Sequence, residues 1–410
     1  MFPGTANPFG LMGPMTVLRD ADGPRRNLPD TDKRSFRSGS RCVGNISRPQ
    51  HFCRNQTFAN SYRCGASRKA TCSAAHSALH RAVRNAPRKD RSMTDRPLAL
   101  IGGAHVHLPD HLEHIDRKGW RISHVIDRDT ARRKRLADAL GATAISHDDL
   151  AQSGCRGAVV CSETIHHEDD IRAALEADLP VFTEKPLAGS AEAATRCAEF
   201  SQRKGLLLHT GYFFRTNPAL QRLHGLLRAD AFGRIAEARM RFSHDGGFAD
   251  WLDLDCWMTE PELACYGGFA DEAVHAIDAL QWLLGPASSS RAATGNHLGW
   301  PVDDHGAALL HFDTGATGVV EGGWTDHAMR LELDVVGDKG WATVRDEVVR
   351  AFKRGASSAF LEAELSPLDA GDGIDPFLEA IDGREASGLV PAADAARVNA
   401  LLDQMWLRLV

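Results

Sequence analysis

Three side chains in two separated segments of this sequence could together remove a proton from an alcohol. Lys185 follows a short apolar run, and Asp271 and His275 lie much later in the chain, four positions apart. Residues four apart share one face of a helix, and a neutral imidazole can accept a hydroxyl proton near neutral pH. An ammonium group beside the same oxygen would stabilise the developing alkoxide. This chemistry needs a hydride acceptor nearby, so the rest of the chain must provide a site for one.

Short apolar runs and amphipathic helices alternate over residues 97–209. This pattern is typical of a parallel sheet covered on both faces by helices. Ligands of such a sheet bind at the carboxyl ends of its strands, which is where Glu184 and Lys185 fall. We expect strands at 98–101, 122–126, 142–145, 158–161, 181–183 and 206–209, and helices at 109–118, 130–140, from 147, 167–177 and 191–204.

The pattern changes after Gly211, where strand-like runs follow one another through tight turns. Consecutive strands joined by tight turns are antiparallel, so we expect a separate α+β domain. Its predicted strands are 235–242, 306–312, 317–324, 330–336 and 342–345, and its predicted helices are 220–227, 271–284, 375–381 and 392–407.

The turn after the first predicted strand carries a reduced dinucleotide fingerprint. In G-x-G-x-x-G, small residues let the backbone approach the pyrophosphate at a helix N-terminus. Gly102 matches the first glycine, Ala104 replaces the second, and His107 replaces the third. His107 is large for this position but could point outward toward a phosphate. We include His105, from the same turn, among the cofactor-binding candidates.

Asp127 strengthens the dinucleotide interpretation because it ends the second predicted strand. An acid at this position takes both ribose hydroxyls of NAD, and its charge disfavours a 2′-phosphate, so NAD is preferred over NADP. Because Arg128 follows directly, NADP stays an alternative cofactor. Asp127 could also merely end a strand. Ser162 lies where the nicotinamide half would pass, and His167 could contact the cofactor, cap a helix or be solvated.

The net charge of the sequence changes sign at Met93. The net charge of −6 combines +12 over residues 1–92 with −18 over the rest. The basic segment is interpreted in three ways: upstream sequence before a start at Met93, a targeting leader, or a nucleic-acid arm. No apolar run is long enough to span a membrane. The nine cysteines form no C-x-x-C pair, so we expect no metal site, reduced thiols and a cytoplasmic location.

Four motifs then occur in one order along the chain: FTEKPLA at 182–188, GYFFRTNP at 211–218, GGFADEAVHAID at 267–278, and FLEAI with Gly383 at 377–383. Together they resemble the Gfo/Idh/MocA family, named after glucose–fructose oxidoreductase and inositol dehydrogenase. The resemblance covers most of residues 97–407. The chain departs from the family pattern in the missing fingerprint glycines, in Glu163 where proline is usual, and in Tyr266 where a glycine is common.

The resemblance implies an α/β fold: an N-terminal Rossmann domain with a doubly wound parallel sheet, plus a C-terminal α+β domain with an open, mostly antiparallel sheet. The predicted boundaries are an extension at 1–92, an NAD-binding domain at 93–212, and a substrate-binding and oligomerisation domain at 213–410. It implies catalytic roles for Lys185, Asp271 and His275, with Glu184 beside the cofactor. It also implies a homodimer or homotetramer.

Several of these residues have structural alternatives. Asp271 could be only a helix N-cap, and His275 could be a satisfied buried histidine. Tyr212 and Arg215 could contact the substrate together with Asp271 and His275, or could join the two domains. Four tryptophans could stack on a sugar face or pack in the core: Trp251, Trp257, Trp300 and Trp324.

We therefore expect an NAD-dependent dehydrogenase that acts on a sugar, inositol or related polyol. Two alternatives stay open at this point. One is a glycosidase of the same family that oxidises its substrate and then reduces it again with the same NAD. The other is a non-catalytic protein that senses NAD or a sugar.

Overall fold

The structure is a computed structural model of the chain and describes residues 96–249 and 251–406. The extension predicted at 1–92 lies outside these residues, so its three interpretations stay predictions. Among the described helices, none combines the length and the apolar composition that crossing a membrane requires.

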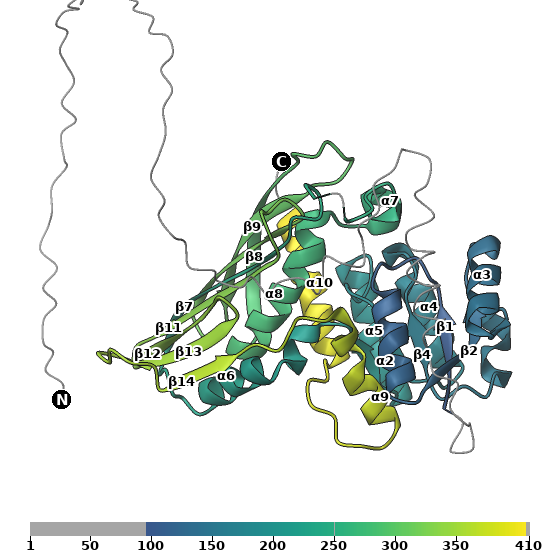
Figure 1. Cartoon of the computed structure of the whole chain (residues 1–410), viewed down its shortest axis with the longest axis horizontal. Coiled ribbons are helices and arrows are strands. Elements are labelled where there is room, and N and C mark those ends of the chain that lie inside the picture. The colour runs from purple at the N-terminus through teal and green to yellow at the C-terminus, as the bar shows by residue number, and fades with distance from the viewer. Residues whose placement is uncertain (1–95, 250, 407–410) are drawn as a thin grey trace, which may run out of the picture. The chain divides into compact units, whose positions relative to one another are not determined.

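Six parallel strands form the first sheet (Figure 1). Their spatial order is β3-β2-β1-β4-β5-β6, in which the direction of strand addition reverses between β1 and β4. The predicted doubly wound parallel sheet is thereby confirmed. The strands are β1 (Pro97–Ile101), β2 (Arg121–Ile126), β3 (Thr143–Ala144), β4 (Ala158–Val160), β5 (Val181–Thr183) and β6 (Leu208–Thr210).

Helices connect these strands, and their ends follow local sequence signals. Asp129 accepts hydrogen bonds from two backbone amides at the start of α3, and Ser190 accepts one at the start of α5. Gly141 and Gly205 end the same two helices in the left-handed conformation that favours glycine. The helices are α2 (Leu108–Arg117), α3 (Thr130–Leu140), α4 (His167–Glu176) and α5 (Ala191–Lys204), with a 3-10 helix, η2, at His147–Gln152.

Eight strands form the second sheet, in the order β14-β13-β12-β11-β7-β10-β9-β8. Only β10 and β7 run parallel, so the predicted mostly antiparallel sheet is confirmed. The sequence patterns miss β8, β13 and β14, which lie toward the two edges. The strands are β7 (Ile235–Ser243), β8 (Ala287–Gly295), β9 (His305–Phe312), β10 (Thr317–Gly323), β11 (Arg330–Gly337), β12 (Gly340–Arg345), β13 (Val348–Lys353) and β14 (Leu361–Glu364).

Helix α8 (Gly268–Leu284) lies on the inner face of the second sheet and is buried on nearly all sides. It packs on β7 and β10, and α10 (Ala392–Trp406) packs against both α8 and α5 (Figure 1). The remaining helices of this part are α6 (Pro218–Arg228), α7 (Pro261–Ala264) and α9 (Asp375–Ile381). Helix α9 returns to the first sheet, where Phe377 joins the apolar cluster around Leu98 and Phe182.

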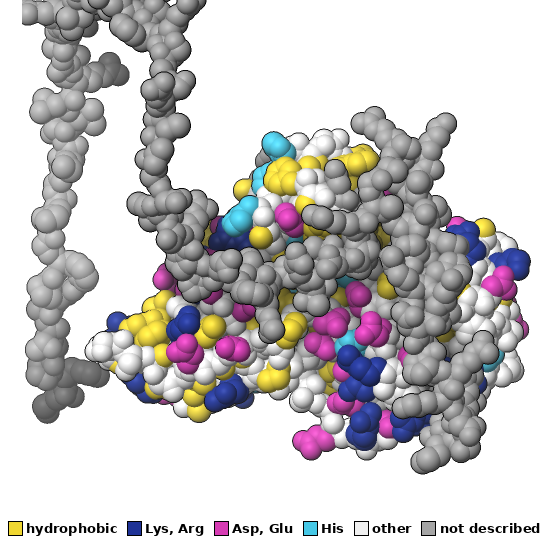
Figure 2. Space-filling model, viewed as in Figure 1, with side chains coloured by type: hydrophobic (Ala, Val, Ile, Leu, Met, Phe, Trp, Pro, Cys, Tyr) yellow, Lys and Arg dark blue, Asp and Glu magenta, His cyan; other side chains and the backbone are white. Residues whose placement is uncertain are grey.

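Ionic contacts hold α2 against the segment that leads into α9. The ring of His114 is buried and lies 3.1 Å from Asp369 Oδ2 and 3.0 Å from Asp375 Oδ1. Lys118 reaches Asp375 and Glu379 at 3.1 and 2.7 Å. In Figure 2, acidic and basic side chains alternate over this region. Burial opposes protonation of His114, but the two carboxylates outweigh it and raise the pKa of His114 to about 9.

The His114 contacts predict a pH-dependent stability. A histidine whose pKa rises from 6.5 to about 9 on folding contributes fully below 6.5, and the contribution is lost as the pH rises toward 9. We expect His114→Gln to lower the free energy of unfolding by about 1–3 kcal/mol at pH 6 and by much less at pH 9. Urea unfolding at both pH values measures this. His311→Gln, on the exposed face of β9, is the control, and an equal loss at both pH values would contradict the assignment.

Candidate active site

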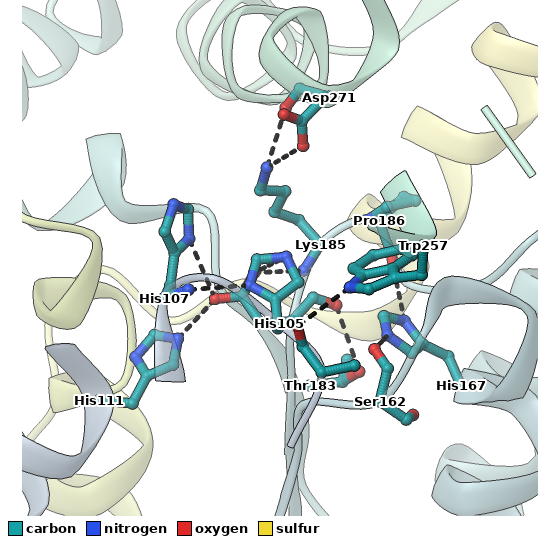
Figure 3. Close-up of polar contacts among 12 residues, drawn as sticks. His105, His107, His111, Ser162, His167, Thr183, Lys185, Pro186, Trp257 and Asp271 are labelled. Carbon is teal, nitrogen blue, oxygen red and sulfur yellow. Dashed lines mark hydrogen bonds and ion pairs between the residues drawn. The ribbon is translucent and has the colours of Figure 1, made fainter. Parts of the chain in front are cut away.

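Lys185, which is buried, and Asp271, which is partly buried, form an ion pair between the two parts of the chain (Figure 3). Lys185 Nζ donates to Asp271 Oδ1 at 2.5 Å and to the Asp271 backbone carbonyl at 3.1 Å. Lys185 follows β5, and Asp271 lies in the first turn of α8. Burial lowers the pKa of Lys185, but the Asp271 carboxylate outweighs this and the net pKa is raised. Burial raises the pKa of Asp271, but Lys185 outweighs this and holds it well below its usual range.

A set of close contacts fixes the first turn of α8, which presents Asp271. Trp324, just after β10, donates from Nε1 to Asp271 Oδ2 at 2.8 Å. A Cβ at Gly268 would lie 2.6 Å from the Trp324 ring, so glycine is needed for this approach. Asp303 accepts the Gly268 amide through its backbone carbonyl at 2.7 Å and the Phe269 amide through its carboxylate at 2.9 Å. The Asp271 carboxylate is therefore held from two sides.

His275 lies one turn after Asp271 on α8, inside a shell of aromatic rings. Ring centroids of Phe213, Phe242 and Tyr212 lie 4.7, 5.6 and 6.0 Å from its own. Its Nδ1 is buried and has no hydrogen-bond partner among the described residues. Burial, and then the nearby Lys185 charge, lower its pKa well below the ordinary value, so the ring is neutral.

Glu184 contacts three histidines, His105, His107 and His111, which Figure 3 labels. His111 Nε2 lies 2.5 Å from its carboxylate, His107 Nδ1 3.3 Å and His105 Nε2 3.5 Å, and the Lys185 backbone amide donates at 2.9 Å. The carboxylate is 1% exposed, so these groups replace its lost hydration. Burial raises the pKa of Glu184, but His105 and His107 outweigh this and hold it well below the usual range.

Donor atoms of His105, His107 and Glu184 all lie within 4.8 Å of one another, which is close enough for a metal ion. The contacts favour a hydrogen-bonded anchor instead. His105 Nδ1 accepts the His107 backbone amide at 3.3 Å, so the proton of a neutral His105 ring lies on Nε2, toward Glu184. In this arrangement the imidazoles serve Glu184 as donors, and Glu184 attaches the turn and α2 to the end of β5.

The turn after β1 has the close packing that a dinucleotide site requires. Gly102 has φ of 75°, and a Cβ there would lie 2.4 Å from Ser162 Cα, so the position requires glycine. The amides of Ala104 and His105 both donate to the carbonyl of Cys161, at 3.0 and 3.1 Å. The turn therefore lies directly against the end of β4, and it leads into α2, whose N-terminus favours anions.

Asp127 directly follows β2 and is buried in a charge network. Arg132 donates to it from Nε and Nη2 at 2.6 and 2.9 Å, and Nη2 also donates to Glu163 at 2.8 Å. Arg128, predicted beside the cofactor, instead donates to Asp170 of α4 at 2.7 Å. The charged edge at the end of β2 thus consists of two carboxylates bridged by one guanidinium, with both oxygens of the buried Asp127 side chain accepting from Arg132. An acid at this position is the group that fits the adenosine half of a dinucleotide.

His167, at the first position of α4, is completely buried. Its Nδ1 lies 2.9 Å from the Pro186 carbonyl and its Nε2 3.2 Å from the Ser162 carbonyl (Figure 3). Burial lowers its pKa, so the neutral ring donates to one carbonyl at a time. His167 thus links the end of β4 to the segment after β5, which carries Lys185.

Arg215 and Tyr212 occupy the junction between the two parts of the chain. Arg215 donates to Asp278 of α8 from Nε and Nη2 at 2.9 and 2.7 Å, and to Asp394 of α10 from Nη1 at 3.1 Å. Its side chain is 4% exposed. Tyr212 is 1% exposed and lies at right angles to His275. The contacts of Arg215 are those of a residue that joins helices.

A cavity lies between the two parts of the chain, next to the ion pair. His105, Thr164, Lys185 and Pro186 line it from the side of the parallel sheet. Asp271 and a largely apolar set of residues line it from the other side. Of the predicted site residues, the cavity brings together Lys185, Asp271 and His105, whereas Tyr212, Arg215 and His275 are not among its lining residues.

Two models of one protein family match the sequence over most of this architecture. The oxidoreductase family with NAD-binding Rossmann fold matches residues 98–212, and the GFO/IDH/MocA C-terminal domain matches residues 220–343. Together they cover more than half of the 410 residues. The chain belongs to the Gfo/Idh/MocA family. The resemblance stated from the sequence is thereby confirmed.

Curated relatives of this Gfo/Idh/MocA chain include two dehydrogenases. A myo-inositol dehydrogenase of Streptomyces leeuwenhoekii is 27% identical over 249 residues, which are 58% of this chain and 72% of the relative. An NADP⁺-dependent D-xylose 1-dehydrogenase of Haloferax volcanii is 27% identical over 228 residues, which are 54% of this chain and 67% of the relative.

Solved structures show the same Gfo/Idh/MocA fold. Levoglucosan dehydrogenase in complex with NADH and levoglucosan has a TM-score of 0.64 at 18% identity, covering 76% of this chain and 97% of that one. GenD2 from gentamicin A biosynthesis, in complex with NAD, has a TM-score of 0.63 at 24% identity, covering 78% and 95%.

Sequence reasoning missed several contacts in this Gfo/Idh/MocA site. His111 could have been found, because it lies four residues after His107 and shares its helical face. Arg132 lies close to Asp127 in sequence, but nothing in the pattern indicates its bridge to Glu163. The hydrogen bond from Trp324 to Asp271 joins segments 53 residues apart and has no local signal.

His107 predicts a pH-dependent cofactor affinity. Its side chain is 26% exposed and precedes α2. Burial lowers its pKa, but Glu184 outweighs this and the net pKa is raised, so the cation persists to higher pH. A cation at the helix N-terminus attracts a pyrophosphate. We expect NAD affinity to fall roughly two- to fivefold as the pH rises from about 6 to about 9. Titration by fluorescence or calorimetry measures it.

His107→Gln should remove this pH dependence, and His311→Gln should keep it. His107 also faces Lys185, Asp110 and the two other histidines of the Glu184 cluster. An unchanged pH dependence in His107→Gln would assign it to one of those groups instead.

Proposed function

We propose that this protein is an NAD-dependent dehydrogenase that oxidises a hydroxyl group of a sugar, inositol or related polyol. The observation that carries the proposal is the Lys185–Asp271 ion pair at the wall of a cavity between the parallel sheet and the second domain. Membership of an oxidoreductase family with an NAD-binding fold supports it. The named activities of the inositol and xylose dehydrogenase relatives support the substrate class.

Lys185 is the group that would contact the reacting hydroxyl. Its ammonium form persists because Asp271 raises its pKa, and a fixed ammonium stabilises negative charge that develops on the substrate oxygen. A bound nicotinamide supplies the hydride acceptor. Asp271 accepts from Lys185 and Trp324 at once, so it fixes the direction of the ammonium group and holds it in the cavity wall.

His275 is our proposed acceptor of the hydroxyl proton. Two observations support this role: it lies four residues after Asp271 on the same helical face, and its buried Nδ1 has no partner among the described residues. A buried polar atom without a partner costs stability, and such atoms are found where a ligand or reaction supplies the partner. The lowered pKa keeps the ring neutral, so the unpaired nitrogen can accept a hydrogen bond from the substrate hydroxyl.

The ion pair predicts the effects of two substitutions on turnover. Lys185→Met and Asp271→Asn should each lower kcat by roughly 10²–10⁴-fold, because the alkoxide loses its stabilising charge or the ammonium loses its direction. NADH absorbance with a panel of polyols measures the rates. Lys134→Met, in an exposed pair with Asp138, is the control. Wild-type rates in both variants would contradict the assigned roles.

We also propose a preference for NAD over NADP. Asp127 and Glu163 contribute two negative charges at the end of β2, and Arg132 contributes one positive charge. The net negative charge disfavours a 2′-phosphate, while the Asp127 carboxylate can accept from a ribose hydroxyl. The preference depends on the ion pairs that Arg132 forms with these two acids.

Freeing Arg132 should change the cofactor preference. In Asp127→Asn the guanidinium loses one of its two negatively charged partners and keeps an ion pair with Glu163 alone, so a phosphate can compete for it. We expect the ratio of kcat/KM with NAD to kcat/KM with NADP to fall by roughly tenfold or more. Asp138→Asn on the exposed face of α3 serves as the control. A ratio that does not change in Asp127→Asn would show that Asp127 does not set the preference.

A further inference from the structure

Helix α10 contacts both of the segments that carry the proposed site residues. Asn399 and Asp403 lie four positions apart on this helix, so they share one face. Asn399 is completely buried, and Asp403 is half-buried. Neither residue lines the cavity, so any effect on the reaction must pass through the residues that they contact.

On one side, this face of α10 holds the segment between Lys185 and α5. Asn399 Nδ2 donates to the Ala188 carbonyl at 2.7 Å. Asp403 Oδ2 accepts from the backbone amide of Ala191, the first residue of α5, at 2.7 Å. A carboxylate is favourable there because the N-terminus of a helix carries a partial positive charge. Two side chains of α10 therefore fix the chain just after Lys185.

On the other side, the same two side chains hold Tyr266, which directly precedes the Gly267 N-cap of α8. The Tyr266 hydroxyl donates to Asp403 Oδ1 at 2.6 Å and accepts from Asn399 Nδ2 at 3.3 Å. Burial, and then the hydrogen bond to Asp403, raise the pKa of Tyr266, so the hydroxyl keeps its proton. Helix α10 therefore also fixes the start of α8, which presents Asp271.

The two segments also contact each other directly. A Cβ at Gly189 would lie 2.6 Å from Cys265 Sγ, so the close approach requires glycine. Gly189 follows Ala188, and Cys265 precedes Tyr266, so this contact lies beside both of the points that α10 holds. Contacts among the two segments and α10 therefore form a closed ring behind the cavity wall.

The direction of the Lys185 ammonium depends on how the two segments are aligned. Its Nζ donates to the carboxylate and to the backbone carbonyl of Asp271, which leaves one N–H for a substrate oxygen. A shift of either segment would turn this N–H away from the substrate. A misplacement of about 1 Å can lower a rate roughly 10²-fold.

We propose that Tyr266, Asn399 and Asp403 are positioning residues for the reaction: through α10 they align the Lys185 ammonium with the start of α8. This inference rests on the proposed function. The ring of Tyr266 lines the cavity, but its hydroxyl is bound to α10. A glycine, which is common at this position in the family, could not make the connection.

Tyr266→Phe tests the proposal because it removes the hydroxyl and keeps the ring in the cavity wall. We expect the rate of hydride transfer to fall roughly tenfold, with the Kd for NAD and the KM for the polyol nearly unchanged. Stopped-flow NADH absorbance measures the rate, and calorimetry measures the Kd. Asn399→Leu, which removes the donor to Ala188, should show the same pattern.

Ser290→Ala is the matched control. The Ser290 hydroxyl is also buried, and it donates to the Leu401 carbonyl of α10 at 2.6 Å, so it joins α10 to β8 instead of to the site. We expect this variant to lower the midpoint of urea unfolding about as much as Tyr266→Phe does and to keep the wild-type rate of hydride transfer.

The Lys185→Met background separates positioning from a general loosening of the fold. A residue that acts through Lys185 has little further effect once Lys185 is absent, so Tyr266→Phe should lower the remaining rate by less than about twofold. A loosened fold would instead lower the rate by the same factor in both backgrounds. Equal factors, or a wild-type rate in Tyr266→Phe, would overturn the inference.

Failure of the proposed function would look different. A wild-type protein that forms no NADH from any polyol, and no NADPH when NADP replaces NAD, would contradict the dehydrogenase itself. An active wild-type protein that is impaired by Lys185→Met and unaffected by Tyr266→Phe would contradict the positioning role alone.

Discussion

The largely buried ion pair between Lys185 and Asp271 is the interaction on which the site depends. Either charge alone in this position would be strongly unfavourable, because burial removes its hydration. Together they hold each other ionised, as the opposite shifts of their pKa values indicate. The pair also connects the end of β5 to the start of α8, so the geometry of the cavity follows from where the two sheets place these two segments. Trp324 and Asp303 fix the α8 side of this connection.

The Glu184 cluster shows how a dinucleotide turn can be held with few glycines. Backbone approach at Gly102 still requires glycine, but His107 occupies the place of the third fingerprint glycine. Its bulk is accommodated because its ring turns toward the buried Glu184 carboxylate, which His111 contacts as well. The electrostatic cost of burying Glu184 is offset by the same histidines. The buried Glu184 carboxylate therefore accounts for a turn with few glycines, and the histidines near it account for how the carboxylate can be buried.

Much of the fold could be predicted from the sequence because its signals are local. Helix α3 spans Thr130–Leu140, as predicted, between the Asp129 cap and Gly141, and the parallel strands are short apolar runs. Strand β8 was missed because its sequence, ASSSRAATG, has few of the β-branched and aromatic residues that indicate strands. Strand β8 is stabilised by its antiparallel pairing with β9, which its own sequence does not indicate.

The candidate site likewise contains residues that local motifs predict and contacts that no local signal predicts. Lys185, Asp271 and the Gly102 turn follow from motifs. The Trp324–Asp271 and Trp257–Ala104 hydrogen bonds do not, because each joins segments that only the folded chain brings together. Arg215 was predicted either to contact the substrate or to join the two domains, and in the structure it donates to Asp278 of α8 and Asp394 of α10.

The return of α9 to the first sheet has a consequence for how this protein can be divided or recombined. Phe377 packs within 6.2 Å of Phe182, measured between ring centroids, in the cluster that covers β1 and β4. The nucleotide-binding half is thus completed by residues from the far end of the chain. A chimera joined near residue 212 would replace α9 together with the second half and so change part of the core of the first half. The two halves therefore cannot be exchanged independently between proteins.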